Sequence, residues 1–249
     1  MPVRAPRPLR RRGAGVLVAL VVVASGCGSA SVAELPPPAG PRASPPLTVA
    51  PAGRVVKGRT LAGGAVVDRD DPGRGGGFEA GRGGRAAGRA EGRARVRVDG
   101  GRTALVLGRE RVVELRDDRT GATLGRAGAG VGPTRGVSKE RWLWVADTEG
   151  DALLVFRVRP KLELVRRVFL AGGPYAIAID EEKARLWVTL TGSNEVVELP
   201  AHGRPSELRR FPTVRQPDAI AVDSVSHRVS IGGRESLQLL DPPPLVRRR

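Results

Sequence analysis

The sequence predicts an all-β protein, and three observations support this prediction. A short phrase is spelled twice, as "PYAIAID" over residues 174–180 and as "PDAIAVD" over residues 217–223. Short apolar runs, partly β-branched or aromatic, recur between clusters of Gly, Pro, Asp and Ser, which is the pattern of strands and hairpins. These runs lack the apolar period of about 3.6 residues that marks an amphipathic helix.

The repeated phrase belongs to a longer repeat. When the chain is aligned on the residue that ends each such run, at Asp99, Ser138, Asp180 and Asp223, the spacings are 39, 42 and 43 residues. Four short antiparallel strands in about 40 residues make one blade of a β-propeller. We therefore predict a β-propeller with about four to five four-stranded blades, and an incomplete ring remains open as an alternative.

Each repeat is expected to hold its strands in the same order. A strand with small residues comes first, and the Asp that ends it is expected to cap the next turn by accepting backbone N–H bonds. The tryptophans of the second strands are expected to pack between blades. The expected second strands are 103–107, 141–146, 185–190 and 227–231, the third strands are 111–115, 152–156, 195–199 and 237–241, and the fourth strands include 164–170 and 207–214.

The two ends of the predicted propeller, residues 48–245, are expected to meet. The last repeat lacks a fourth strand, and residues 48–56 carry a segment that is able to supply it from the N-terminal side. Joining the ends of the chain in this way removes an open sheet edge. Residues 69–93 are rich in Gly and Arg with almost no apolar content, so we expect an irregular insertion there, preceded by one strand-like run at 64–68.

The N-terminus predicts an export signal. Residues 1–12 carry five Arg and no acid, and an apolar run follows that is too short for a transmembrane helix of about 20 residues. The run ends in "ASGC", which resembles the lipobox of bacterial lipoproteins, and Cys27 is the only cysteine of the chain. Residues 1–26 are then a lipoprotein signal peptide, with an ordinary signal peptide or an uncleaved anchor as alternatives.

The lipobox resemblance implies a location and a partner. Lipidation of Cys27 would attach the protein to the membrane on the extracytoplasmic side of the cell, because buried acyl chains give stable anchoring. Residues 27–47 are Pro-rich, and we expect them to form a semi-rigid tether. Removal of residues 1–26 lowers the net charge from +16 to about +11.

Two stretches, "WVADTEGDALLVF" at 144–156 and "RLWVTLTGSNEVVEL" at 185–199, resemble the YVTN repeat of bacterial β-propellers. Trp144 and Trp187 stand where that family has Tyr, and Leu190 stands in place of Asn. The resemblance covers residues 92–241 and implies a propeller that acts as a binding or scaffolding module on the cell envelope. The alternative from related propellers is an enzyme of the lactonase or lyase type with a metal at the channel mouth.

Residues that would carry chemistry are few. The chain has two histidines, His202 and His227, and neither stands in a spaced metal-binding motif. "DSVSH" at 223–227 combines triad residue types, but its members are too close in sequence for triad geometry. Asp147, Glu149 and Asp151 alternate as in a calcium loop without the remaining ligands. We therefore predict no catalytic residue, no metal and no cofactor.

The expected partner is a protein or a small molecule of unknown identity. The positive charge would attract nucleic acid, but aromatic residues make up only 3% of the chain, and single-strand binders stack bases on aromatic rings. We therefore expect no nucleic acid. If a ligand site exists, we expect it in the loops that carry Arg135, Tyr175 and Asp218, which follow the prolines of three repeats.

Overall fold

The computed structural model describes residues 35–62, 65–68 and 92–244. The predicted signal peptide, Cys27, the first part of the predicted tether and nearly all of the predicted insertion at 69–93 lie outside these residues. Arg93, the last residue of that predicted insertion, begins strand β4. The described part contains no helix that is long and apolar enough to cross a membrane.

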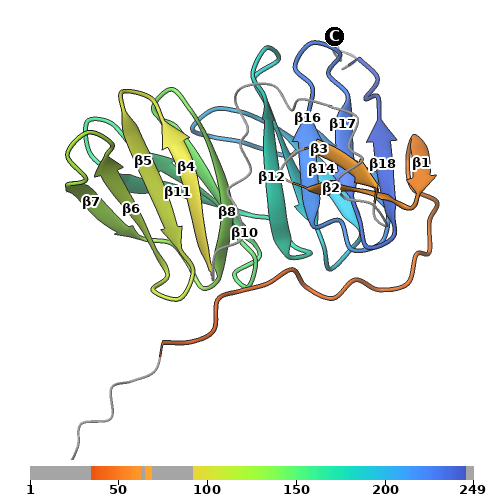
Figure 1. Ribbon diagram of the computed structural model, residues 1–249, viewed down its shortest axis with the longest axis horizontal. Coiled ribbons are helices and arrows are strands. Elements are labelled where there is room, and N and C mark those ends of the chain that lie inside the picture. The colour runs from red at the N-terminus through yellow and green to blue at the C-terminus, as the bar shows by residue number, and fades with distance from the viewer. Residues whose placement is uncertain (1–34, 63–64, 69–91, 245–249) are drawn as a thin grey trace, which may run out of the picture. The chain divides into compact units, whose positions relative to one another are not determined.

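Four antiparallel sheets of four strands each make up most of the described chain, as the sequence repeat predicts (Figure 1). We call them blades 1 to 4 in chain order. Blade 1 holds β4 (Arg93–Val98), β5 (Arg102–Leu107), β6 (Val112–Asp117) and β7 (Thr123–Gly128); blade 2 holds β8 (Pro133–Lys139), β9 (Trp142–Asp147), β10 (Ala152–Arg157) and β11 (Glu163–Phe169); blade 3 holds β12 (Pro174–Asp180), β13 (Arg185–Leu190), β14 (Glu195–Pro200) and β15 (Arg209–Pro212); blade 4 holds β16 (Ala219–Val222), β17 (Val229–Gly232), β18 (Ser236–Leu240) and β1 (Arg54–Lys57).

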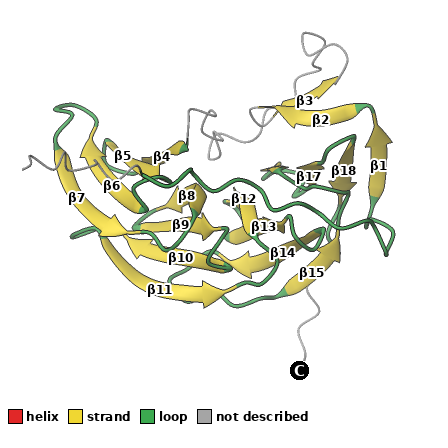
Figure 2. Cartoon of the chain, turned by 90° about the horizontal axis from the view of Figure 1, so that it is seen from below, coloured by secondary structure: helices red, strands yellow, loops and turns green. Residues whose placement is uncertain are grey.

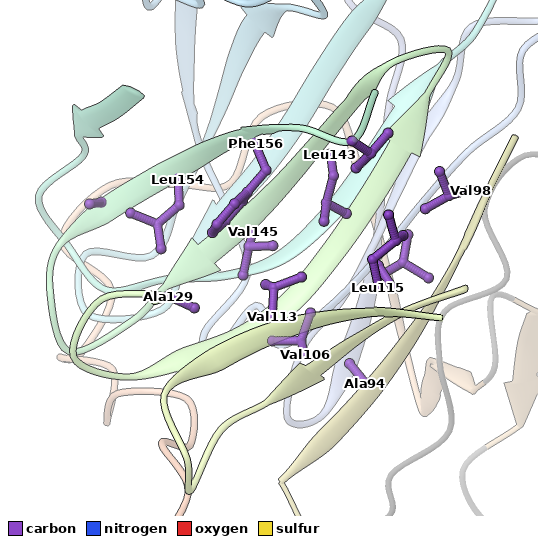
Figure 3. Close-up of a cluster of buried hydrophobic side chains, with 14 residues drawn as sticks. Ala94, Val98, Val106, Val113, Leu115, Ala129, Leu143, Val145, Leu154 and Phe156 are labelled. Atoms are coloured by element: carbon purple, nitrogen blue, oxygen red, sulfur yellow. The ribbon is translucent and has the colours of Figure 1, made fainter. Parts of the chain in front are cut away.

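The blades pack side by side through their innermost strands, β4 on β8, β8 on β12 and β12 on β16. A separate apolar cluster fills each of the three spaces between blades. Figure 3 shows the cluster between blades 1 and 2, where Val106 and Val113 lie near Leu143 and Phe156. Trp144 packs between blades 2 and 3 and Trp187 between blades 3 and 4, both almost fully buried, which confirms the expected role of these side chains.

The N-terminal segment completes blade 4, as predicted. Strand β1 pairs antiparallel with β18, with Arg54 opposite Leu239 and Lys57 opposite Ser236. The strand-like run expected at 64–68 is β3 (Ala65–Asp68), which pairs only with β2 (Arg59–Ala62) in a separate hairpin. Strand β2 packs alongside β16, β17 and β18, so the hairpin covers the side of blade 4 that faces away from blade 3.

The aspartates that end two innermost strands cap the following turns, as predicted. Asp223 accepts bonds from the N–H groups of Val225 at 2.8 Å and Ser226 at 3.1 Å. These bonds hold the pKa of Asp223 below its ordinary value. Asp180 accepts the N–H of Lys183 at 3.0 Å in the same way. The recurring Asp therefore has a structural reason at these two positions.

Candidate functional site

The connections that enter each blade and the turns between its second and third strands lie at the same end, because the strands alternate in direction. We call this the strap end of the blades, since residues 38–52, the strap, run along it. In Figure 1 the strap is the orange segment that passes below the blades to β1, and Figure 2 shows it as a loop crossing them. Pro38 lies against Gly92 of blade 1, and Ala52 bonds to Pro212 of blade 3 at 3.0 Å.

The strap corrects the predicted tether. Residues 27–47 were expected to form a spacer because a Pro-rich segment buries little apolar surface. Residues 38–47 instead lie against the blades, and they are held by polar contacts and by close packing on glycines. Composition does not reveal these contacts, because the bonding partners come from loops more than 100 residues away.

Arg42 lies between blades 2 and 3 at a partly exposed binding position, which we call the first pocket, and its side chain is 38% exposed. Its two terminal nitrogens bind the two carboxylate oxygens of Asp151, each at 2.9 Å. The same carboxylate accepts the N–H groups of Gly172 at 3.0 Å and Gly173 at 2.9 Å. Burial raises the pKa of Asp151, but the Gly173 N–H, Arg42 and the Gly172 N–H together outweigh it and hold that pKa below its ordinary value. The carboxylate is therefore ionised and fully engaged.

The glycines of this pocket make room for the strap. A Cβ on Gly173 would lie 2.8 Å from Cδ of Arg42, and the residue also has φ +67°, which disfavours any other residue. Gly132 has a similar place under the strap, since a Cβ there would lie 2.8 Å from that of Ala39. These close approaches mean that the Arg42 and Ala39 side chains lie directly on the loops.

Ser44 occupies a second pocket, formed by blades 3 and 4, and is buried. Its hydroxyl donates to the carbonyl of Thr191 and accepts the N–H of Gln216 at 3.0 Å. The Gln216 side chain binds the strap backbone twice, accepting the N–H of Ser44 at 3.1 Å and donating to the carbonyl of Arg42 at 2.7 Å. Asn194 donates to the carbonyl of Pro45 at 2.9 Å. The pocket thus binds both main chain and side chain.

Comparisons of sequence give no relative for this chain: no family model matches it, and no curated protein matches it significantly. Comparisons of structure give distant matches among solved proteins. A protein of unknown function from Desulfotomaculum acetoxidans aligns with a TM-score of 0.54 at 11% identity, over 62% of this chain and 52% of that one. Hydrazine synthase from Kuenenia stuttgartiensis aligns with a TM-score of 0.52 at 17% identity, over 59% and 45%.

A further solved structure, the β-propeller domain of Cps50 (Swd1) from Myceliophteria thermophila, aligns with a TM-score of 0.50 at 12% identity, over 61% of this chain and 55% of that one. The fold is a β-propeller. This chain spans about half the length of the solved chains that it matches. At these identities the likeness establishes the fold alone.

Arg135, Tyr175 and Asp218, the residues predicted to contact a ligand, lie just after the loops that enter blades 2, 3 and 4 at the strap end. Arg135 and Tyr175 come together, with the guanidinium carbon 5.6 Å from the ring centre. The strand register pairs Pro133 with Asp147 and Pro174 with Leu190, so Thr134, not Arg135, is the structural equivalent of Tyr175.

Tyr175 is 7% exposed and packs in the cluster between blades 3 and 4. Asp218 is half-buried just before β16. A ligand role for these residues stays a prediction.

The propeller engages its acidic residues in structural contacts. The buried Asp147 accepts N–H bonds from Gly132 at 2.7 Å, Val131 at 3.1 Å and Gly150 at 3.2 Å, so this part of the calcium-like pattern stabilises loops. Within the described residues, no three His, Cys, Asp or Glu side chains gather closely enough to hold a metal ion.

His227 contacts the neighbouring blade and not its own "DSVSH" turn. Its Nδ1 lies 2.8 Å from a carboxylate oxygen of Asp180, which ends the innermost strand of blade 3. This pair lies at the end opposite the strap. Sequence reasoning missed the pair, and also missed Asp151, Asn194 and Gln216 as partners of the strap, because none of these contacts has a local sequence signal.

Proposed function

We propose that this protein is a lipid-anchored, extracytoplasmic β-propeller that acts as a binding module on the cell envelope. The observation that carries the binding role is the strap end, where groups from three blades converge and hold an extended segment. Propellers present their ligand sites on loops at one end of the blades, and here the loops at that end bind a peptide through side chains and backbone. The anchor rests on the lipobox-like "ASGC" sequence ending at Cys27.

The strap supports the anchored arrangement. Only 11 residue steps separate Cys27 from Pro38, the first strap residue, so the strap end would stay within about 40 Å of the acyl chains even if the intervening chain were extended. A binding module held this close would act on partners at the membrane surface.

Expression of the full chain with its leader in a bacterial host tests the anchor. We expect the wild-type protein in the detergent phase after phase separation, labelled by a fatty-acid analogue. Cys27→Ser should move to the aqueous phase without label, because the acyl chains supply the membrane affinity. Ser29→Ala, two residues away, is the matched control and should behave as wild type. Equal detergent partitioning and labelling of Cys27→Ser would contradict the anchor.

A further inference from the structure

We propose that the strap end is a peptide-binding site specific for an extended Arg-x-Ser-Pro segment, with residues 42–45 of the same chain as its resident ligand. The inference deepens the proposed binding function and rests on it, since it names the class of partner. That partner is a peptide segment of a protein that matches "RASP" in its two anchor side chains.

The first anchor pocket selects arginine. A planar guanidinium matches a carboxylate with two parallel bonds, and Arg42 meets both oxygens of Asp151 in this way. A third bond reaches the carbonyl of Glu149 at 3.4 Å. Lysine would supply a charge but not the paired geometry. The pocket therefore distinguishes the two basic side chains.

The second anchor pocket selects a small hydroxyl residue followed by proline. Ser44 is 9% exposed, and its hydroxyl both donates and accepts within the pocket, so alanine would leave the Thr191 carbonyl and the Gln216 N–H without this partner. The next residue, Pro45, offers only a carbonyl, which Asn194 binds. Because proline has no N–H, no donor of the ligand is left unpaired at this position.

Between the anchors, the site recognises main chain in the manner of a peptide receptor. The side-chain amide of Gln216 bonds on both sides of residue 43, to the carbonyl before it and the N–H after it. No side-chain contact of Ala43 is needed for these bonds, so this position tolerates variation. Recognition by backbone bonds, with specificity from flanking pockets, is typical of extended-peptide binding.

Part of the site is held by contacts within the blades. The N–H groups of Gly172 and Gly173 fix Asp151, and Asn194 accepts the N–H of Gln216 at 3.2 Å. Gln216 has φ +56°, a conformation that is uncommon for residues other than glycine and asparagine and that the surrounding structure must hold. A preformed site binds with less loss of conformational entropy.

The resident segment must be weakened before a second segment can enter. A tethered ligand acts at an effective concentration on the order of millimolar, so a free peptide at micromolar concentration cannot displace it. The proposal therefore predicts no binding to the wild-type chain and measurable binding once the strap anchors are removed.

Fluorescence anisotropy with a labelled synthetic peptide of residues 38–48, "PAGPRASPPLT", tests this prediction. The receptor is the full chain with Arg42→Ala and Ser44→Ala, which weaken the strap and leave every pocket residue intact. We expect binding at least about tenfold tighter than to the wild-type chain, the difference produced by removing the tethered competitor. The same peptide with Lys or Ala in place of Arg42 should bind at least about tenfold more weakly, since neither residue makes the two parallel bonds to Asp151.

Two further receptors locate the site. Asp151→Asn, added to the strap variant, should abolish peptide binding, whereas Asp118→Asn, an exposed acid at the opposite end of blade 1, should not change it.

A thermal melt confirms that each receptor is folded. If the Arg42→Ala and Ser44→Ala double variant is not folded, Ser44→Ala alone replaces it. No binding to a folded strap variant up to about 1 mM peptide, or binding that is indifferent to Asp151→Asn, would show that the strap is only a structural brace and would overturn the inference. Neither result bears on the membrane anchor, which the Cys27 experiment decides separately.

Discussion

The two end faces of the blade series have the same strand arrangement and opposite chemistry. We call them the outward face of blade 1, on the side away from blade 2, and the outward face of blade 4, on the side away from blade 3. The strand registers give the rows of side chains on each face. The blade 1 rows are Arg95, Leu105, Glu114 and Arg126, then Arg97, Thr103 and Arg116; the blade 4 rows are Ala219, Gly232, Leu237 and Val56, then Ala221, Ser230 and Leu239.

The outward face of blade 4 is covered, whereas that of blade 1 stays in contact with water through its arginines. Strand β2 packs along β16, β17 and β18, and Leu237 and Ala221 are buried there. On blade 1, Arg95 and Arg97 are exposed. A blade can therefore end the series in two ways, by an added hairpin over apolar residues or by a face that remains hydrated.

One buried acid stabilises the charged face. Glu114 is 5% exposed and bonds to Arg116, to Arg126 at 3.3 Å and to the Thr123 hydroxyl at 3.1 Å. The hydrogen bond from Arg116 is the largest of the effects that hold the pKa of Glu114 below its ordinary value, and it acts against the opposing effect of burial. On the outward face of blade 4 the third strand presents the apolar Leu237 instead of an acid, which contributes to the contrast.

The largest expected effect comes from the same substitution made once on each outward face. Ser230→Asp would place a carboxylate at a fully buried site between Ala221 and Leu239, and we expect a loss of about 3 kcal/mol or more in the free energy of unfolding. Thr103→Asp lies between Arg97 and Arg116 and should change it by less than about 0.5 kcal/mol. Urea unfolding of both variants measures the difference, and equal losses would contradict the contrast between the faces.

A smaller loss is expected when the buried acid on the outward face of blade 1 is replaced by leucine. Glu114→Leu removes the acid shared by Arg116 and Arg126 and should lower the free energy of unfolding by about 1–2 kcal/mol, because it leaves these cations facing each other. Glu114→Gln retains a hydrogen-bond acceptor and should lose less. A Leu variant as stable as wild type would mean that the ion pairs do not stabilise this face.

The same acid should make stability depend on pH. Because the pKa of Glu114 is lower in the folded chain than its ordinary value of about 4.5, its stabilising contribution is complete above about pH 4.5 and is lost as the pH falls through the folded pKa. Thermal melts between pH 7 and pH 3 should show a shallower decline for Glu114→Gln than for wild type. Parallel declines would assign the acid sensitivity to other groups.

The smallest effect on stability is expected at the exposed arginines. The double variant Arg95→Glu and Arg97→Glu should change the free energy of unfolding by less than about 0.5 kcal/mol, since exposed charges contribute little. It should bind vesicles containing anionic lipid more weakly than wild type, because each arginine near such a surface contributes about 1 kcal/mol. Arg166→Glu with Arg204→Glu, exposed residues of other blades, is the matched control. Identical vesicle binding by both double variants would show that the charge of this face has no special role.

The repeat in the sequence determined the blade unit and its strand order. Small residues alternating with Ile and Val in "PYAIAID" mark an innermost strand, and the period of about 40 residues marks one blade. The pairing of β1 with β18 was also predictable, because the last repeat visibly lacks its fourth strand and residues 48–56 carry a segment that is able to supply it. Lipidation of Cys27, which the lipobox-like sequence indicates, remains a prediction from the sequence alone.

Only the tertiary structure decided the strap and the contrast between the end faces. The strap is Pro-rich and has little apolar surface, so local pattern predicts a spacer; what orders residues 38–47 is a set of bonds to Asp151, Asn194 and Gln216 from three separate turns. The same limit hid the pair of His227 and Asp180. Strand periodicity reports which side of a strand is apolar, because that depends on neighbours in the sequence, whereas polar contacts between blades depend on which turns the packed sheets bring within about 3 Å of each other.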